Sequence, residues 1–555
     1  MRKFTCPCAL VVVIGTASVA RPQETKCVSV DSSGAPSNDW SQEPAISEDG
    51  RAISFWSGGD NLIAGDTNAK ADVFVYDRST GLMERVSVDS SGAEANDNSF
   101  SFSALSADGR IVAFYSFATN LVAGDTNGEP EIFVHDRSTG ITERICVDST
   151  GAEGDGGSEF AALSFDGRFV AFDSGATNLV PNDANANEDV FVHDRQTGIT
   201  ERVSVDSTGA ECHGLCFLPS LSADGRFVAF SSYASDLVAN DTNGVCDVFV
   251  HDRATGATER VSVDSAGAQA LHGDSAWSRI SDDGRYVVYQ SWASNLVAND
   301  TNQYLDVFVR DRVLGTTERA SVDSAGSEAD GGGVGPTISA DGRFVAFSSD
   351  ATNLVAGDTN GREDCFVHDR VSGLTECVSV ATPASPLDSD SEGMSISANG
   401  ELFVFWTDAD NVVPGDTNGY PDVFVRDRVK AQWSNYGVGL AGSNGVPALT
   451  AESDPVLGVP LTIDVGNSSG AATAALLFVG FTKASLHSSL GGDLLVLPVL
   501  AIPLAVPDTG ASLTATIPVD PSLGDFEIDL QALEVDAGAV KGVSFTAGLQ
   551  LILGH

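Results

Sequence analysis

The feature that most constrains the fold is a stretch at positions 237–253, LVANDTNGVCDVFVHDR, that recurs along the chain in seven copies. Its first Asp falls at Asp66, Asp125, Asp183, Asp241, Asp300, Asp358 and Asp416, so successive copies are 58 or 59 residues apart. A fixed period of this length is the signature of a repeat architecture and outranks weaker local signals. The chain is therefore expected to be built from seven copies of one structural unit.

Each repeat carries four strand signals and no helical period. In the fourth repeat we expect strands at 219–222, 226–232, 247–253 and 258–264. An Asp-Gly turn, a long Asp-Asn loop and a Gly-bearing three-residue turn separate them, and the two short turns are typical of hairpins. The Val-Phe-Val runs are apolar on both faces, as in strands covered by a neighbouring sheet on each side. Seven units of four antiparallel strands predict an all-β, seven-bladed β-propeller.

The two ends of the repeat array complement each other. The seventh repeat lacks its fourth strand, whereas residues 25–31 (TKCVSVD) match a fourth strand with no blade of its own. We expect this N-terminal strand to complete the seventh blade and close the ring, because closure removes an exposed sheet edge.

Changes of composition divide the chain into parts. Residues 1–20 have the features of a secretory signal peptide, with Arg2 and Lys3 before an apolar run at 9–15 and a small-residue cleavage site, Ser-Val-Ala, at 18–20. The propeller is assigned to residues 21–430, a Gly-rich linker to 431–445 and a small β-sandwich to 446–555. We expect an exported monomer that is periplasmic, cell-surface or secreted and has no transmembrane segment.

The charge balance restricts the partners. A formal net charge of −47, with only 30 Lys and Arg, argues against nucleic acid and anionic membranes. The short turns combine Asp, Glu and Arg, for example Asp224 with Arg226 and Glu259 with Arg260, so their charges are expected to cancel. The acid excess should then lie on the opposite face, with the Asp-Asn loops and the connections between blades, and we expect function there.

The phrase SADGRFVAFSS…DVFVHDR resembles the TolB-type, WD40-like propeller repeat, whose core reads S-P-D-G-x-x-I-A-F…I-Y-x-x-D. This resemblance covers positions 40–430, but Ala, Asp, Glu or Phe replaces the Pro before Asp-Gly. It implies an interaction scaffold more often than an enzyme. The stretch at 436–465, YGVGLAGSNGVPALTAESDPVLGVPLTIDV, resembles a C-terminal module of secreted planctomycete-type bacterial proteins, which has Cys where this chain has Leu440.

The Asp-Asn loop, D-T-N-G-x-x-D, resembles part of the calcium loops of EF-hand, dockerin and thrombospondin-type repeats. Clustered Asp and Asn oxygens beside a Gly turn suit a hard cation. Ala or Pro stands two residues before the first Asp, and Val250 stands where a bidentate Glu is expected. The alternative is an Asx-turn in which these side chains cap their own backbone. The predicted calcium ligands are Asp66, Asn68, Asp72, Asp125, Asn127, Glu131, Asp183, Asn185, Asp189, Asp241, Asn243, Asp247, Asp300, Asn302, Asp306, Asp358, Asn360, Asp364, Asp416, Asn418 and Asp422.

Three aromatic residues vary against the repeat background in blades that neighbour each other in a closed ring: Trp56, Tyr115 and Trp406. They could stack a sugar or anchor a peptide, and the alternative is packing between loops. Cys365 and Cys377 replace Val248 and Arg260 of the fourth repeat, on adjacent strands. They are predicted to form a disulfide, with two independent buried thiols as the alternative.

Four histidines share one position of the "FVHDR" segment and are expected to be exposed at blade edges: His135, His193, His251 and His368. No nucleophile elbow, phosphate loop or zinc motif stands out from the repeat. The leading hypothesis is an exported, non-enzymatic scaffold that binds calcium and presents an acidic face to a protein or glycan partner. The alternatives are a carbohydrate-active lyase or glycosidase that uses this acidic face, and a structural protein of the cell envelope.

Overall fold

The computed structural model describes residues 25–101, 104–185, 187–381, 385–428, 432–436, 440–451, 455, 460–488, 493–517, 527–539 and 541–553. The predicted signal peptide, residues 1–20, lies outside these ranges. The chain divides into two compact units, one formed by Glu24–Asp427 and the other containing Arg428–His555. No helix in the described ranges is long and apolar enough to cross a membrane.

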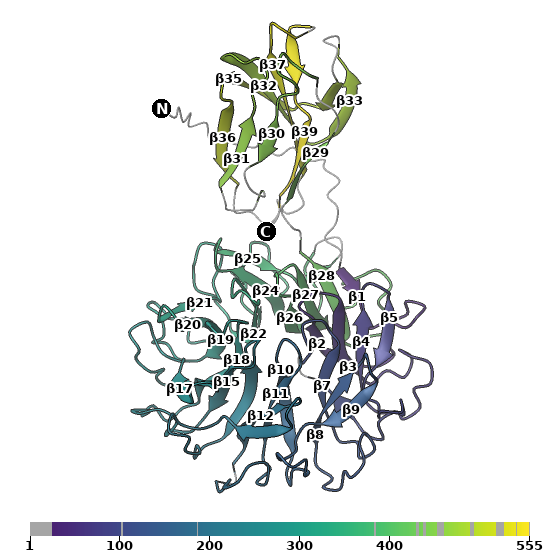
Figure 1. The fold of residues 1–555 in the computed structure, drawn as a ribbon, viewed down its shortest axis with the longest axis vertical. Helices are drawn as coiled ribbons and strands as arrows, with labels where there is room; N and C mark the ends of the chain where they lie inside the picture. Colours follow the sequence, from purple (N-terminus) through teal and green to yellow (C-terminus); the bar gives the residue numbers. More distant parts are fainter. Residues whose placement is uncertain are drawn as a thin grey trace. The chain divides into compact units, whose positions relative to one another are not determined.

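The first unit consists of seven antiparallel four-stranded sheets within the described ranges, arranged as the blades of a propeller (Figure 1). Blades 1 to 3 are β2 (Ser41–Ile46), β3 (Ala52–Ser57), β4 (Asp72–Asp77), β5 (Leu82–Arg85); β6 (Ser99–Phe100), β7 (Ile111–Ser116), β8 (Glu131–Asp136), β9 (Ile141–Arg144); and β10 (Ser158–Leu163), β11 (Phe169–Ser174), β12 (Asp189–Asp194), β13 (Ile199–Arg202). Blades 4 to 6 are β14 (Cys216–Leu221), β15 (Phe227–Ser232), β16 (Asp247–Asp252), β17 (Ala257–Arg260); β18 (Ser275–Ile280), β19 (Tyr286–Ser291), β20 (Asp306–Asp311), β21 (Thr316–Arg319); and β22 (Gly333–Ile338), β23 (Phe344–Ser349), β24 (Asp364–Asp369), β25 (Leu374–Cys377).

Blade 7 joins the two ends of the first unit and confirms the predicted closure. It comprises β26 (Ser391–Ile396), β27 (Leu402–Thr407) and β28 (Asp422–Asp427), and its outer strand is β1 (Thr25–Cys27). β1 runs antiparallel to β28, with Lys26 opposite Val425. Beyond β1, Val28 N–H donates to the carbonyl of Val423 at 2.8 Å. The N-terminal segment therefore supplies the fourth strand that the seventh repeat lacks.

The Val-Phe-Val runs explain why the blades stack face to face. In β4, Val73, Phe74 and Val75 are all fully buried, because each face of the sheet is covered by another blade. Val73 and Val75 pack with Phe114 and Phe133 of blade 2, while Phe74 packs with residues of blade 7 such as Val423. Burying both faces in this way stabilises the ring through one apolar layer between each pair of sheets.

The innermost strand of each blade for which the register is described along its length contains a β-bulge after its second residue. Four of these bulges place a non-glycine residue in the left-handed region, with φ between 47° and 55°: Glu43, Phe160, Leu218 and Trp277. Gly335 and Gly393 stand there in blades 6 and 7. A bulge changes the direction of a side chain, and residues held in this region often mark functional sites.

The second unit is also built only from antiparallel strands in its described part, in agreement with the predicted β-sandwich. One sheet has the order β29 (Gln432–Tyr436), β39 (Gly548–Ile552), β37 (Glu527–Val535), β32 (Thr473–Gly480), β35 (Leu500–Val506), with β38 (Val543–Phe545) paired to β37. Two smaller sheets are β30 (Leu449–Ala451), β31 (Pro460–Val465), β36 (Ala511–Thr516), and β33 (Lys483–His487) with β34 (Asp493–Val496).

The prediction of a linker at 431–445 is wrong for its first part. β29 falls within this range and pairs with β39 over five residues, from Gln432 opposite Ile552 to Tyr436 opposite Gly548. Leu440 further pairs with Phe545 in an isolated bridge. The glycines of this segment suggested a free linker, but strand pairing with the C-terminal end of the chain makes it part of the second unit.

Candidate functional site

The Asp-Asn loops bring their predicted ligands together just before the third strand of each blade. In blade 1, Asn68 Nδ2 donates to Asp72 Oδ2 at 3.1 Å, and Asn68 Oδ1 accepts from the backbone N–H of Lys70 at 2.8 Å. The bond from Asn to the acid recurs in all seven blades. The backbone bond to the Asn side chain also recurs in all seven, which is the Asx-turn considered as the alternative to calcium.

An arginine of the fourth strand lies among these carboxylates in five blades. Arg85 Nη1 is 3.1 Å from Asp72 Oδ2 and 3.3 Å from Asp66 Oδ1, and Nη2 is 3.0 Å from Glu94 Oε2. The corresponding arginines of blades 2 to 5 contact the acids of their own loops: Arg144, Arg202, Arg260 and Arg319. In these five blades a guanidinium therefore already occupies the place predicted for calcium.

The expected pairing of this arginine is wrong. Glu259 and Arg260 were expected to cancel each other's charge at the short turns, but they are neighbours in one strand and therefore point to opposite sides of the sheet. Glu259 pairs with Arg312 of the next blade, whereas Arg260 faces Asp241 and Asp247. The sequence does hold a signal for this arginine. In each of the first five repeats, an Arg is followed nine residues later by a Glu or Gln.

Blades 6 and 7 lack both of these residues. Cys377 and Cys27 stand in the arginine position, since they pair with Phe366 and Phe424 as Arg85 pairs with Phe74. The position of the Glu or Gln, which forms an isolated bridge in every blade, is Pro386 in blade 6 and Pro36 in blade 7.

The acids of these two loops remain in place without the arginine. Asp422 Oδ1 accepts from Ser29 Oγ at 2.5 Å, and its Oδ2 accepts from Asn418 Nδ2 at 2.6 Å. No ion pair within the described ranges reaches Asp358, Asp364, Asp416 or Asp422. Burial raises the pKa of Asp422 to about 7 and that of Asp416 to about 6.

A second group of carboxylates forms an arc around the inner strands. Glu43 and Glu392 repel each other, Glu392 repels Glu363, and on the other side Glu159 repels Glu188. Glu43, Glu159 and Glu392 lie near the start of innermost strands, and Glu188 and Glu363 end the Asp-Asn loops of blades 3 and 6. This places the arc on the long-loop side of the propeller, where excess acid was expected.

The arc is electrostatically unbalanced. Burial and the neighbouring carboxylates raise the pKa of Glu43 to about 7 and that of Glu363 to about 7. Burial also raises the pKa of Asp173 well above its usual range. Arg279 is a cation that favours the charged form of Glu43, but it is not within ion-pair distance. These groups would gain from a positive charge supplied by a ligand.

Arg279 lines a partly open cavity of ≈ 160 Å³ among the innermost strands. The lining also includes Leu105, Phe160 and Leu218. The register positions equivalent to Arg279 hold Ala45, Ala162, Ser220, Thr337 and Ser395 in other blades. An Arg in a column of small residues is a break in the repeat that the sequence prediction missed, although aligning the inner strands would have revealed it.

The predicted aromatic residues pack within and between blades. Trp56 and Tyr115 both contact Phe100, with ring centroids 5.1 and 5.3 Å apart, respectively. Trp406 instead packs against the core between blades 7 and 1, next to Gly393. All three are partly buried and lie on strands β3, β7 and β27 rather than in loops, and their role as ligand-binding residues stays a prediction. Another aromatic pair, the exposed Trp277 and the partly buried Phe160, lies at the bulges with ring centroids 6.4 Å apart.

The predicted disulfide between Cys365 and Cys377 is wrong, and both thiols are free. Cys377 pairs with Phe366, so Cys365 is offset by one residue and faces the other side of the sheet. Cys365 packs in the core toward blade 7, and Cys377 packs in the core toward blade 5.

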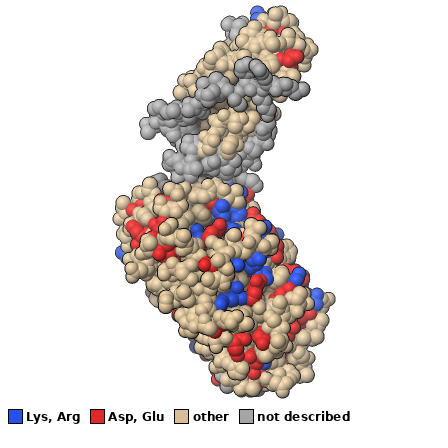
Figure 2. All heavy atoms as spheres, turned by 90° about the vertical axis from the view of Figure 1, so that its left-hand side faces the viewer, with Lys and Arg blue, Asp and Glu red and all other residues tan. Residues whose placement is uncertain are grey.

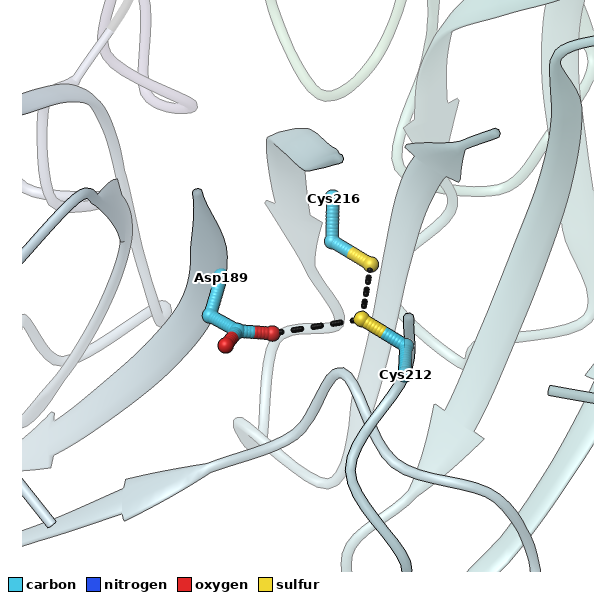
Figure 3. A group of neighbouring side chains, drawn as sticks. All are labelled: Asp189, Cys212 and Cys216. Carbon is cyan, nitrogen blue, oxygen red and sulfur yellow. Dashed lines mark hydrogen bonds between the residues drawn. The ribbon is translucent and has the colours of Figure 1, made fainter. Parts of the chain in front are cut away.

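A different cysteine pair is in contact. Cys212 and Cys216 of blade 4 have their Sγ atoms 2.8 Å apart, and Cys212 Sγ is 3.3 Å from Asp189 Oδ1 (Figure 3).

The repeated histidines are buried, contrary to prediction. His251 Nδ1 is 2.9 Å from Thr258 Oγ1, and Thr258 Oγ1 donates to the carbonyl of Val205 in the connection from the preceding blade. The same His–Thr contact is present at the other three positions. Burial lowers the pKa of each of these histidines, which favours the neutral ring. They therefore join neighbouring blades.

The short-turn elements pair their charges as predicted. Arg226 Nη2 is 2.7 Å from Asp252 Oδ2 in blade 4, and Arg253 Nε is 2.6 Å from Glu201 Oε1 of blade 3. Figure 2 shows acidic and basic side chains interspersed on one face of the molecule. This pairing leaves the carboxylate arc and the loops of blades 6 and 7 as the candidate sites.

No model of a protein family matches the sequence, and no curated protein matches it. The chain is similar in structure to a TolB from Agrobacterium tumefaciens, with 13% identity and a TM-score of 0.34 over 63% of this chain and 95% of that chain. It is similar to the WD40 repeats of RRP9, with 8% identity and a TM-score of 0.37 over 73% and 98% of the two chains.

A GH74 xyloglucanase from Xanthomonas campestris is similar with 10% identity and a TM-score of 0.38, over 95% of this chain and 81% of the enzyme. The β-propeller itself follows from the seven four-stranded sheets in the described ranges.

Proposed function

We propose that this chain is a non-enzymatic binding protein whose propeller holds a positively charged segment of a partner protein at the carboxylate arc. The observation that carries the proposal is the set of Glu43, Glu159, Glu392 and Glu363, which gather on the long-loop side without a matching set of cations among the described residues.

The physical reason is the low dielectric at the inner strands. Carboxylates that repel one another in a partly buried place bind an incoming cation more strongly than exposed carboxylates do. Lys or Arg side chains of a partner would relieve this repulsion. The exposed face of Trp277, which is 39% accessible, offers an apolar contact beside the arc. Aromatic anchors of this kind are frequent at interface hot spots.

Binding of a metal cation, which the sequence predicts as calcium, is part of the proposal only for blades 6 and 7. In blades 1 to 5 an arginine already balances the loop carboxylates, and calcium would have to displace it. Export and the monomeric state remain parts of the proposal that rest on sequence composition.

The test is binding of a fluorescent Lys- and Arg-rich peptide, with a Glu-substituted version of the same length as the negative probe. The variant Glu43→Gln/Glu159→Gln/Glu392→Gln should weaken binding at least about tenfold, which corresponds to about 1.4 kcal/mol. A matched control is Glu84→Gln/Glu143→Gln/Glu201→Gln, which removes the same charge from the short-turn ion pairs and should leave the affinity unchanged.

Binding should also weaken between pH 8 and pH 6. Protonation of Glu43 and Glu363, whose pKa values lie at about 7, removes the charges that attract the peptide. Equal loss in both triple variants would refute the proposed site. A glycan array run on the same protein distinguishes the carbohydrate alternative, because glycan binding or cleavage without peptide binding would overturn the proposal.

A further inference from the structure

The loop of blade 7 keeps the two acids that contact an arginine in other blades, although blade 7 has no arginine at that position. In blade 4, Asp241 Oδ1 and Asp247 Oδ2 lie 3.0 and 3.1 Å from the same guanidinium nitrogen of Arg260. Blade 7 keeps both acids as Asp416 and Asp422, but the residue in the arginine position is Cys27.

The unsatisfied atom in blade 7 is Asp416 Oδ1. Asp416 is 5% exposed, and this oxygen has no hydrogen-bond partner among the described residues. Asp66 Oδ1 and Asp183 Oδ1 have no hydrogen-bond partner either, but they lie 3.3 and 3.4 Å from an arginine nitrogen, which blade 7 lacks. The equivalent Oδ1 atoms of Asp66, Asp183, Asp241 and Asp300 face the guanidinium of their blade. Asp416 Oδ1 is therefore directed at the place that the arginine would occupy. A buried carboxylate oxygen without a donor is costly, and a bound cation would satisfy it.

In blades 1 to 5 a Glu or Gln holds the loop by hydrogen bonds, and we call this residue the clamp. Blade 7 lacks the clamp as well as the arginine. In blade 2, Glu153 accepts from Thr126 N–H at 2.8 Å and from Thr126 Oγ1 at 2.7 Å, and so holds the loop against the arginine. Blade 7 has Pro36 in this position and an exposed Thr417 in the loop. Two residues that contact each other in blades 1 to 5 have thus changed together in blade 7, while Asp416 and Asp422 stay buried, at 5% and 0% exposure.

We propose that Cys27, Asp416 and Asp422 form a site for a thiol-binding divalent cation of the zinc class, which takes the place of the arginine. A thiolate and carboxylates are ligands that zinc accepts, whereas calcium and magnesium take oxygen ligands. Cys27 Sγ is 3.5 Å from Ser29 Oγ, which in turn donates to Asp422 Oδ1. Rotation of the Cys27 side chain away from Ser29 would complete the ligand set, and water can fill the fourth position.

Calorimetric titration of the chelator-treated full chain with zinc tests this site. The Cys27→Arg variant restores the arrangement of blades 1 to 5 and should bind one zinc equivalent fewer than the unaltered chain. Asp416→Asn, which preserves the side-chain shape, should weaken the same site at least tenfold. The control is Cys246→Ala, a buried thiol away from these acids that is Ala71 in blade 1, and it should retain the full stoichiometry.

Cobalt gives an independent readout. The cobalt-loaded chain should show a thiolate-to-metal charge-transfer absorption, and part of it should disappear in Cys27→Arg. Identical zinc stoichiometry in the unaltered chain and in Cys27→Arg would overturn the proposal. Calcium binding that persists in Cys27→Arg but not in Asp416→Asn would also overturn it, because the site would then be a hard-cation site without the thiol.

An independent observation concerns Cys212 and Cys216. Two thiol sulfurs in van der Waals contact lie farther apart than the 2.8 Å that separates this pair, and both side chains are fully buried (Figure 3). A shared zinc ion would hold two thiolates about 3.8 Å apart, from Zn–S bonds of about 2.3 Å in tetrahedral geometry. Asp189, the third member of this group, is already bonded to Asn185, Arg202 and Ser204. The geometry points to a disulfide between Cys212 and Cys216.

Oxidation would remove two protons and two electrons from the two thiols as the S–S bond forms. A disulfide-bearing oxidant protein would accept them and become a dithiol. Mass spectrometry of the chain exported by its host, alkylated while unfolded and unreduced, should show Cys212 linked to Cys216 and Cys246 alkylated. Cys212→Ala should leave Cys216 alkylated. Alkylation of both Cys212 and Cys216 in the unaltered chain would refute the bond.

Discussion

Replacing Arg260 by Cys should turn the cation-balanced loop of blade 4 into one that resembles blade 7. Arg260 contacts Asp241, Asp247 and Gln269 at 3.0 to 3.1 Å, and its side chain is only 10% exposed. Breaking a buried ion pair by removing one partner costs about 3–5 kcal/mol, because the other charges remain buried and uncompensated. We therefore expect Arg260→Cys to lower the free energy of unfolding by about 3–5 kcal/mol in urea titrations with chelator.

Zinc should reverse part of this loss. A ligand at a free concentration of about 100 times its Kd stabilises the folded state by about 2.7 kcal/mol. Arg260→Met is the matched variant, since it removes the same charge but provides no thiol, and zinc should not restore it. A loss below about 1 kcal/mol in Arg260→Cys would refute the view that the arginine balances the loop, because exposed ion pairs contribute that little. Equal recovery of both variants would show that zinc acts elsewhere.

Three further predictions concern the ring, the histidines and the short turns. Removing residues 21–32 should lower the free energy of unfolding of the propeller by at least about 3 kcal/mol, because Val28 is fully buried and Ser29 bonds to Asp422. An unchanged urea midpoint would exclude closure by this segment. Burial lowers the pKa of His251 below its ordinary 6.5, so the stability that the neutral ring contributes is present above pH 6.5 and is lost as pH falls. The variant His251→Arg, which reproduces Arg310 of blade 5, should therefore lose less stability between pH 7 and pH 5 than the unaltered chain. Arg226→Ala should cost less than about 1 kcal/mol, because this arginine is 42% exposed, and a larger cost would contradict the contrast with buried Arg260.

The repeat period and the strand signals were sufficient to predict the architecture. Seven copies with hairpin turns define seven sheets, and the missing and surplus fourth strands at the two ends of the array define the closure between β1 and β28. These features depend on local pattern and chain order. The β-bulges were not predicted, because Phe160 and Trp277 carry no local signal for a left-handed backbone.

The contacts between side chains depended on register, which the sequence pattern does not define. A shift of one residue separates Cys365 from Cys377 onto opposite faces and likewise separates Glu259 from Arg260. The histidines were expected at an exposed edge, but the connection from the preceding blade covers His251. Each error came from placing a side chain on a strand without knowing which neighbour covers that face.

Departures from the repeat carry most of the functional information, because the repeat itself explains what every blade shares. Arginine with glutamate or glutamine accompanies the loop acids in blades 1 to 5, while cysteine with proline accompanies them in blades 6 and 7. These two positions are nine residues apart in the sequence, and in the first five blades their side chains contact each other, while the arginine also contacts the loop carboxylates. Loss of only the clamp would loosen a loop, and loss of only the arginine would leave a buried charge uncompensated. Loss of both, with retention of the acids and gain of a thiol, is the combination expected when the balancing cation is no longer part of the chain.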